Sequence, residues 1–149
     1  MANMDEFEKD FAGEWKWESE ENVDELCKHM ELCEEDKKMM TSMHPSMIIK
    51  RCGDSYDLTY KDANFSFSST VTFGVPYEAK APNDPPFFHN IITSTFENGV
   101  LHDVSVSKLT GEKKRDFELE SKNVDGKLVV HEWKKGDPSV KARRTYVRV

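Results

Sequence analysis

Short runs of alternating apolar and polar residues, separated by turn signals, extend from residue 47 to residue 149. Alternation with a period of two is typical of strands that bury one face. Asn98-Gly99 and Asp125-Gly126 are pairs that favour tight hairpins. Strands joined by hairpins usually lie next to each other. About nine such strands in one small domain are therefore expected to close into a barrel or to divide between two sheets, since both arrangements protect exposed edges.

One strand and two short helices are predicted before this region. Residues 11–20 alternate bulky and polar side chains, which indicates a strand. Apolar side chains then recur at helical spacing, and Asn22 is the predicted N-cap of this first helix. The apolar positions are Val23, Leu26, Cys27 and Met30. A second helix is predicted over residues 34–43 and ends before Pro45. Two helices are too few to form a covering layer, but they can cover one open end of a barrel.

The composition combines a low apolar fraction with many aromatic residues. A chain of 149 residues is predicted to be one domain over 1–149, with residues 1–10 as a short, frayed acidic tail. Hydrophobic residues make up only 37%, whereas roughly 45–50%, glycine included, is usual for a packed globule. Aromatic residues nevertheless make up 11%, which argues against disorder.

The charge and the cysteine count exclude several classes of protein. A net charge of -7 argues against nucleic-acid binding, which requires a basic surface. The three cysteines, Cys27, Cys33 and Cys52, do not make a disulfide framework and are predicted to be reduced thiols. No apolar run approaches the roughly 18 residues of a membrane helix. The acidic first ten residues do not resemble a secretory signal, so a cytoplasmic location is expected and nuclear entry stays open.

No residue pattern indicates a metal site, a cofactor or an enzyme. Cys27, His29, Cys33 and His44 lack the paired spacing of zinc ligands. A thiol nucleophile at Cys27 would need a base and an oxyanion site, and the sequence indicates neither. The 7 glycines are accounted for by turns, so no phosphate-binding loop is predicted.

Five short motifs occur in the same order as in a known protein family. They are Phe11-x-Gly13-x-Trp15-Lys16, Asn22-Val23-Asp24-Glu25, Pro45 with Ile48, Ile49 and Gly53-Asp54, then Asp125-Gly126-Lys127-Leu128, and finally Arg144-Thr145-Tyr146. With this order and spacing, the chain resembles the intracellular lipid-binding proteins, which include the fatty-acid-binding proteins and the cellular retinoid-binding proteins. The resemblance covers nearly the whole sequence after the first ten residues.

The resemblance implies an all-β fold, an antiparallel up-and-down β-barrel of about ten strands (the β-clam) with a two-helix lid inserted after the first strand. It implies an internal cavity that holds one lipid, and a monomeric carrier rather than an enzyme, with no cofactor. The expected partner is a long-chain fatty acid or another small lipid. Transient contact with a membrane or a nuclear receptor is a further expectation, whereas nucleic acid is not an expected partner.

Arg144 and Tyr146 are the predicted head-group ligands. They are two residues apart on a predicted strand and therefore share a face. A buried arginine needs an anion or several acceptors, and a fatty-acid carboxylate fits the planar guanidinium, with a phenol as a third donor. The alternative is a surface arginine in the basic cluster with Lys141, Arg143 and Arg148. The family resemblance favours the ligand site.

The sequence departs from the family at a second inward position, which is often an arginine in fatty-acid binders and a glutamine in retinol binders. Counting back from Leu128 places Ser121 there, whereas counting forward from Gly111 places Glu118 there. Arg115 is predicted to be solvated, as part of the basic run 113–115. The head group is therefore expected either to bind a single arginine or to be neutral.

Further ligand contacts are predicted from the lid and the cavity wall. Val23, Cys27, Met40 and Pro45 are candidate contacts, although the lid residues could simply seat the helices on the barrel. Phe11 and Trp15 are predicted to close the barrel ends, and Phe65, Phe67 and Phe117 to line the cavity. The proline-rich loop 81–86 is predicted to affect ligand entry. Lys28, Lys37 and Lys38 match an import patch of some relatives, but a solvated helix surface is the favoured interpretation.

The sequence thus predicts an intracellular carrier of one long-chain fatty acid or a similar hydrophobic ligand. Two alternatives share the fold: a carrier of a retinoid or another isoprenoid, and a ligand-free protective or scaffolding protein.

Overall fold

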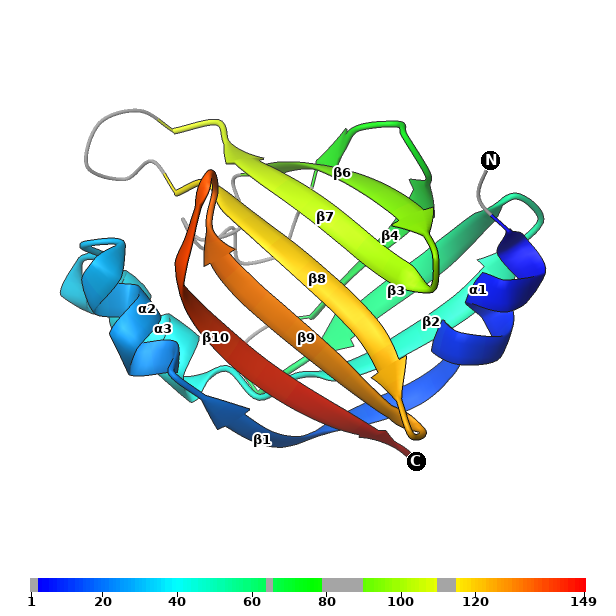
Figure 1. The fold of residues 1–149 in the computed structure, drawn as a ribbon, viewed down its shortest axis with the longest axis horizontal. Coiled ribbons are helices and arrows are strands. Elements are labelled where there is room, and N and C mark those ends of the chain that lie inside the picture. The colour runs from blue at the N-terminus through cyan, green and yellow to red at the C-terminus, as the bar shows by residue number, and fades with distance from the viewer. Residues whose placement is uncertain (1–2, 64–65, 79–89, 110–114) are drawn as a thin grey trace.

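Ten antiparallel strands form one sheet that curves into a nearly closed barrel in the computed structural model (Figure 1). The structure describes residues 3–63, 66–78, 90–109 and 115–149. The strands are β1 (Gly13–Glu21), β2 (Ser46–Cys52), β3 (Ser55–Lys61), β4 (Ser66–Thr72), β5 (Tyr77–Glu78), β6 (Asn90–Glu97), β7 (Val100–Ser107), β8 (Phe117–Val124), β9 (Lys127–Lys134) and β10 (Asp137–Arg148). The predicted up-and-down barrel of about ten strands is confirmed.

The strand order shows how the barrel is assembled. It runs β4-β3-β2-β1-β10-β9-β8-β7-β6-β5, so every neighbouring pair is consecutive in the chain except β1 and β10. The pairing of β1 with β10, which places Trp15 opposite Arg148, joins the two ends of the chain. The predicted hairpins at Asn98-Gly99 and Asp125-Gly126 connect β6 to β7 and β8 to β9. All four of these turn residues have positive φ, as such tight turns require.

Two lid helices lie between β1 and β2, as predicted. They are α2 (Val23–His29) and α3 (Glu34–Ser42). Asn22 precedes α2 in the left-handed conformation, at φ 61°, and its side chain makes no cap hydrogen bond. Asn22 therefore occupies the predicted N-cap position, and its carbonyl accepts a hydrogen bond from the Leu26 backbone at 3.0 Å. The left-handed backbone, which asparagine tolerates, does not bring its side chain into the capping position. His29 at the end of α2 lies 2.8 Å from Asp137 of β10 and ties the lid to the barrel.

A third helix, α1 (Met4–Phe11), replaces most of the predicted frayed tail, so that prediction is wrong for these residues. Asn3 caps the helix by accepting hydrogen bonds from the backbone of Asp5 and Glu6, each at 3.1 Å. Met4, Phe7 and Phe11 lie three and four residues apart and are buried on one face. The acidic residues between them occupy the exposed face. Their charge made the segment resemble a tail, although the apolar spacing is that of an amphipathic helix.

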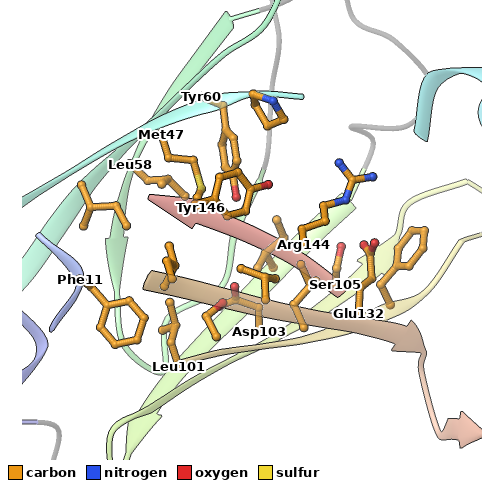
Figure 2. Close-up of a pocket in the computed structure, with 18 of the residues that line it drawn as sticks. Phe11, Met47, Leu58, Tyr60, Leu101, Asp103, Ser105, Glu132, Arg144 and Tyr146 are labelled. Carbon is orange, nitrogen blue, oxygen red and sulfur yellow. The ribbon is translucent and has the colours of Figure 1, made fainter. Parts of the chain in front are cut away.

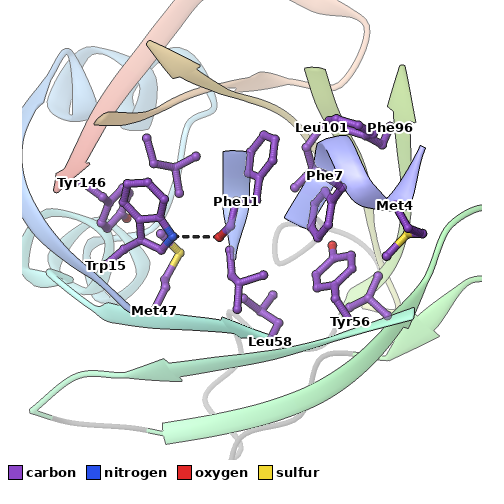
Figure 3. Packing of buried hydrophobic residues seen from close by; sticks show 13 residues of the cluster. Met4, Phe7, Phe11, Trp15, Met47, Tyr56, Leu58, Phe96, Leu101 and Tyr146 are labelled. Atoms are coloured by element: carbon purple, nitrogen blue, oxygen red, sulfur yellow. Dashed lines mark hydrogen bonds between the residues drawn. The ribbon is translucent and has the colours of Figure 1, made fainter. Parts of the chain in front are cut away.

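The buried face of α1 closes the end of the barrel opposite the lid helices (Figures 1 and 3). Phe7 and Phe11 are fully buried, at 0% exposure. The ring of Phe7 contacts those of Tyr56, Phe73 and Phe96, with centroids 4.7, 5.3 and 5.4 Å away. These distances are typical of favourable aromatic pairs.

The indole of Trp15 is also part of this end of the molecule. It is buried, and its Nε1 donates a hydrogen bond of 2.9 Å to the Phe11 carbonyl (Figure 3). Phe11 and Trp15 were expected at the barrel ends, and both lie in the cluster that closes this one. No helix among the described residues is long and apolar enough to span a membrane.

A buried ion pair attaches α3 to the barrel. Arg115, which precedes β8, pairs with Asp36 in the first turn of α3, and the two side chains are 3% and 2% exposed. The prediction that Arg115 is solvated is therefore wrong. A buried guanidinium needs a compensating charge, and the carboxylate that supplies it comes from a helix distant in the sequence.

Truncating Phe7 should lower the free energy of unfolding. Phe7→Ala removes a fully buried ring from the α1 cluster, and such changes typically cost about 3–5 kcal/mol. Lys9→Ala, on the exposed face of the same helix, is the matched control. Chemical denaturation followed by tryptophan fluorescence measures both. Equal stability of Phe7→Ala and the unmodified protein would show that α1 does not hold the end of the barrel closed.

Candidate functional site

A cavity lies inside the barrel, between the α1 cluster and the lid (Figure 2). Its volume is about 150 Å³, which is room for on the order of ten water molecules. Most of the wall is apolar and includes Met47, Ile49, Leu58, Phe67, Leu101 and Val130. Polar side chains interrupt it, among them Asn90, Asp103, Ser105, Ser121, Glu132 and Arg144. A wall of this kind can hold a hydrocarbon chain together with a small number of polar groups.

Arg144 and Tyr146 both line the cavity from β10, where alternate residues face inward. Arg144 is buried, and its guanidinium is directed toward the lid (Figure 2). Its Nη1 donates to the carbonyl of Met43 at 2.7 Å, and its Nη2 donates to the carbonyl of Met40 at 2.8 Å. These two carbonyls lie at the C-terminal end of α3, where helical carbonyls lack partners within the helix. Arg144 therefore lines the cavity and holds the end of a lid helix.

Glu132 of β9 is an ionisable cavity residue that sequence reasoning missed. It lies near Arg144 and Ser105 in Figure 2. Burial raises the pKa of the Glu132 carboxyl, and the charge of Arg144 acts in the opposite direction. Burial also raises the pKa of the neighbouring Tyr146 to about 12, so its hydroxyl stays protonated and can donate a hydrogen bond. Arg144, Glu132 and Tyr146 thus place a cation, an acid and a phenol near one another on the cavity wall.

The structure decides between the two candidates for the second inward position. Ser121 lines the cavity and lies opposite Val130 in the β8–β9 pairing. Glu118 does not line it, and instead accepts hydrogen bonds from Trp133 Nε1 and from the Gly136 backbone, both at 3.0 Å. The hydrogen bond from Gly136 is the main cause of a lowered Glu118 pKa. Neither Ser121, which lines the cavity, nor Glu118, which does not, supplies a cation.

Three of the predicted lid contacts do not line the cavity. Val23, Cys27 and Met40 are buried in a cluster with Phe117 and Ala142, which seats α2 and α3 on the barrel. Pro45, immediately before β2, does line the cavity, and so does Met43. Burial raises the pKa of Cys27 to about 11, which keeps the thiol protonated and unsuited to nucleophilic attack.

The predictions for the cavity wall have mixed outcomes. Phe67 and Phe117 line the cavity, as expected, and Phe11 of α1 lines it as well. Phe65 and the loop 81–86 lie outside the described residues. Within the part of the chain that is described, no group of three or more histidine, cysteine or acidic residues could hold a metal ion.

Asp103 of β7 is a second acidic residue in the cavity that sequence reasoning missed. Burial raises its pKa to about 6. A signal for Asp103 and Glu132 was present in the alternation, because Leu101, Asp103 and Ser105 share one strand face, as do Leu128, Val130 and Glu132. Acidic residues at inward positions of an amphipathic strand mark a polar interior.

The stability of the protein should depend on pH through Asp103. Its carboxyl has a pKa of about 6 in the folded protein and 3.8 as the reference value, so the folded state favours the protonated form. The free energy of unfolding should therefore fall as the pH rises from 3.8 to 6, by up to about 3 kcal/mol at 1.4 kcal/mol per pKa unit. Asp103→Asn should remove this loss and be the more stable protein at pH 7. Denaturation at pH 4 and pH 7 measures the difference, and a variant no more stable than the parent at pH 7 would contradict it.

The comparisons with known proteins agree with the architecture. No protein-family model matches the sequence, and no curated protein matches it significantly. Among solved structures, Caenorhabditis elegans lipid binding protein 8 matches with a TM-score of 0.74 and 22% identity, over 100% of this chain and 99% of that one. Echinococcus granulosus fatty-acid-binding protein 1 matches with a TM-score of 0.74 and 20% identity, over 95% and 98%. The fatty acid transporter REP1-NXSQ matches with a TM-score of 0.72 and 24% identity, over 95% and 97%. The chain has the β-clam fold of the intracellular lipid-binding proteins.

Proposed function

We propose that the protein is an intracellular carrier that binds one long-chain fatty acid, or a similar hydrophobic ligand, inside the barrel. The observation that carries the proposal is the mainly apolar internal cavity with Arg144 at its lid end. The hydrocarbon chain would lie along the apolar wall toward Phe11, and the head group would lie near Arg144 and Tyr146. The solved structures with the same fold include a fatty-acid-binding protein and a fatty acid transporter, which supports this ligand class.

Burial of the hydrocarbon chain supplies most of the binding free energy in this proposal. Each methylene that moves from water to an apolar wall contributes about 0.8 kcal/mol. The polar groups add less affinity, but they fix the orientation of the ligand, because a buried carboxylate without a partner is unfavourable.

Arg144 can serve both the lid and the ligand. A guanidinium carries five N–H donors, and the hydrogen bonds to Met40 and Met43 use two of them. The remaining donors and the Tyr146 hydroxyl can bind a carboxylate in the arrangement typical of arginine–carboxylate pairs. Glu132 would repel an anionic head group, but burial already favours its neutral form. A carboxylate therefore fits best when Glu132 is protonated.

A retinoid or another isoprenoid would use the same cavity, and absorbance of the purified protein in the near ultraviolet would reveal it. Cytosolic transport, nuclear delivery and transient contact with membranes or a nuclear receptor stay predictions that follow from the proposed carrier role.

Native mass spectrometry after titration with palmitate should show one bound fatty acid per protein. Arg144→Ala should weaken palmitate binding about 10- to 100-fold, because a hydrogen bond to a charged group contributes about 1.5–3 kcal/mol. Arg143→Ala is the matched control. Arg143 is adjacent on the same strand and pairs with Glu21 at 2.7 Å outside the cavity, so its removal should leave the affinity unchanged.

Hexadecanol separates the head-group contact from damage to the lid. It has a neutral head group, so Arg144→Ala should weaken its binding much less than that of palmitate. Equal losses of affinity for palmitate and hexadecanol would show that Arg144 acts only by holding the lid and does not bind the head group. A protein that takes up neither ligand would overturn the carrier proposal and favour a ligand-free role for the fold.

A further inference from the structure

Ser94 and Asp103 form a polar pair on the cavity side of the sheet, apart from the head-group residues. Ser94 of β6 lies directly opposite Asp103 of β7 in the strand pairing, so their side chains share a face. Asp103 lines the cavity. Figure 2 shows it beside Leu101, away from Arg144 and Glu132. The pair is therefore distinct from the residues that the proposed function uses for a head group.

Both members of this pair have a buried oxygen without a hydrogen bond. Ser94 is 0% exposed, and its Oγ has no hydrogen-bond partner; the same holds for Oδ1 of Asp103. A buried polar atom without a hydrogen bond destabilises the folded protein by about 1–3 kcal/mol. Most buried polar groups in folded proteins are satisfied, so two such atoms on paired residues, of which Asp103 lines the cavity, need an explanation. A ligand group that can reach them is one.

Two tyrosines border the same pair. Burial is the main cause of raised pKa values for Tyr56 and Tyr77, and in both cases Ser94 acts in the opposite direction while Asp103 raises the pKa further. The Ser94 hydroxyl therefore lies among both phenols and the Asp103 carboxyl, close enough for its hydrogen bonding to lower the pKa of all three groups. None of these contacts has full hydrogen-bond geometry at Ser94 Oγ. Tyr56 and Tyr77 also line the cavity. The Asp103 carboxyl is a strong acceptor, and the hydroxyls of Ser94, Tyr56 and Tyr77 around it can both donate and accept hydrogen bonds.

We propose that Asp103, Ser94, Tyr56 and Tyr77 form a second polar subsite, which binds a hydroxyl group located within the hydrocarbon chain of the ligand. This inference rests on the proposed carrier function and narrows its ligand class to chain-hydroxylated fatty acids. A hydroxyl donates its proton to Asp103 and accepts a hydrogen bond from Ser94 or a tyrosine. A keto group only accepts and leaves Asp103 unsatisfied, whereas an unsubstituted chain satisfies neither atom.

A positional series of hydroxystearates tests the subsite, with stearate as the reference ligand. Dissociation constants are measured by displacement of a fluorescent fatty acid at pH 7.5. One position of the hydroxyl should bind at least about tenfold more tightly than stearate, the gain expected for a hydrogen bond to a charged acceptor. The ketostearate with its oxygen at that position should bind no more tightly than stearate.

Variants assign the preference to the subsite residues. Asp103→Leu should abolish the preference for the hydroxyl while stearate still binds, and Ser94→Ala should reduce it. Thr95→Ala is the matched control for Ser94→Ala, because Thr95 is the next residue on β6 and is exposed on the other face. It should keep the full preference. Denaturation of each variant confirms that the barrel is folded.

The outcomes separate the two proposals. Binding of stearate with no preference at any hydroxyl position, or a preference that persists in Asp103→Leu, would overturn the subsite and leave the carrier function standing. An equal gain from the keto group would show that the pair does not act as an acceptor and would also overturn it. Failure of every fatty acid in the series to bind would overturn both.

Discussion

The cavity depends on the way in which hydrophobic packing is concentrated at one end of the barrel. Met4, Phe7 and Phe11 of α1 fill that end together with rings from β3 and β6. Phe11 also forms part of the cavity wall, so the packed cluster and the hollow share a boundary. A barrel of this size that was filled throughout would need more apolar residues than the 37% present. Because α1 closes one end with dense packing, the middle of the barrel can stay open and partly polar.

Much of the architecture could be predicted from local patterns, whereas contacts between distant segments could not. The hairpins at Asn98-Gly99 and Asp125-Gly126 follow from the conformational preferences of these residues, and the lid helices follow from apolar spacing. Helix α1 was missed because its acidic residues dominated the composition of a segment whose apolar spacing was helical. The burial of Arg115 depends on Asp36, which belongs to a different element. Single-sequence patterns do not reveal such pairs.

The candidate site likewise contains residues that local patterns predicted and others that they did not. Arg144, Tyr146, Ser121 and Pro45 were predicted and line the cavity. Counting from two different turns gave Ser121 and Glu118 as candidates for the second inward position. The strand pairing decides between them, because Ser121 lies opposite Val130, and both of these residues line the cavity. Asp103 and Glu132 were missed because acidic residues on strands usually face solvent. Their presence means that the cavity combines one guanidinium with two carboxyls whose pKa values are raised by burial. An ionised carboxyl in this interior would repel an anionic head group, so Arg144 has to offset that charge for a carboxylate to bind.

Arg144 belongs to two structures at once, the wall of the cavity and the attachment of α3. Its hydrogen bonds to Met40 and Met43 end on a helix whose other residues face outward into solvent or onto the barrel. In the proposed carrier, a head group that drew the Arg144 guanidinium inward would weaken this attachment. A lid that held the guanidinium firmly would, in turn, weaken the binding of the head group. The exposed surface of α3 is thereby thermodynamically linked to the contents of the barrel. A partner that recognises this surface could distinguish an occupied barrel from an empty one without contacting the bound molecule.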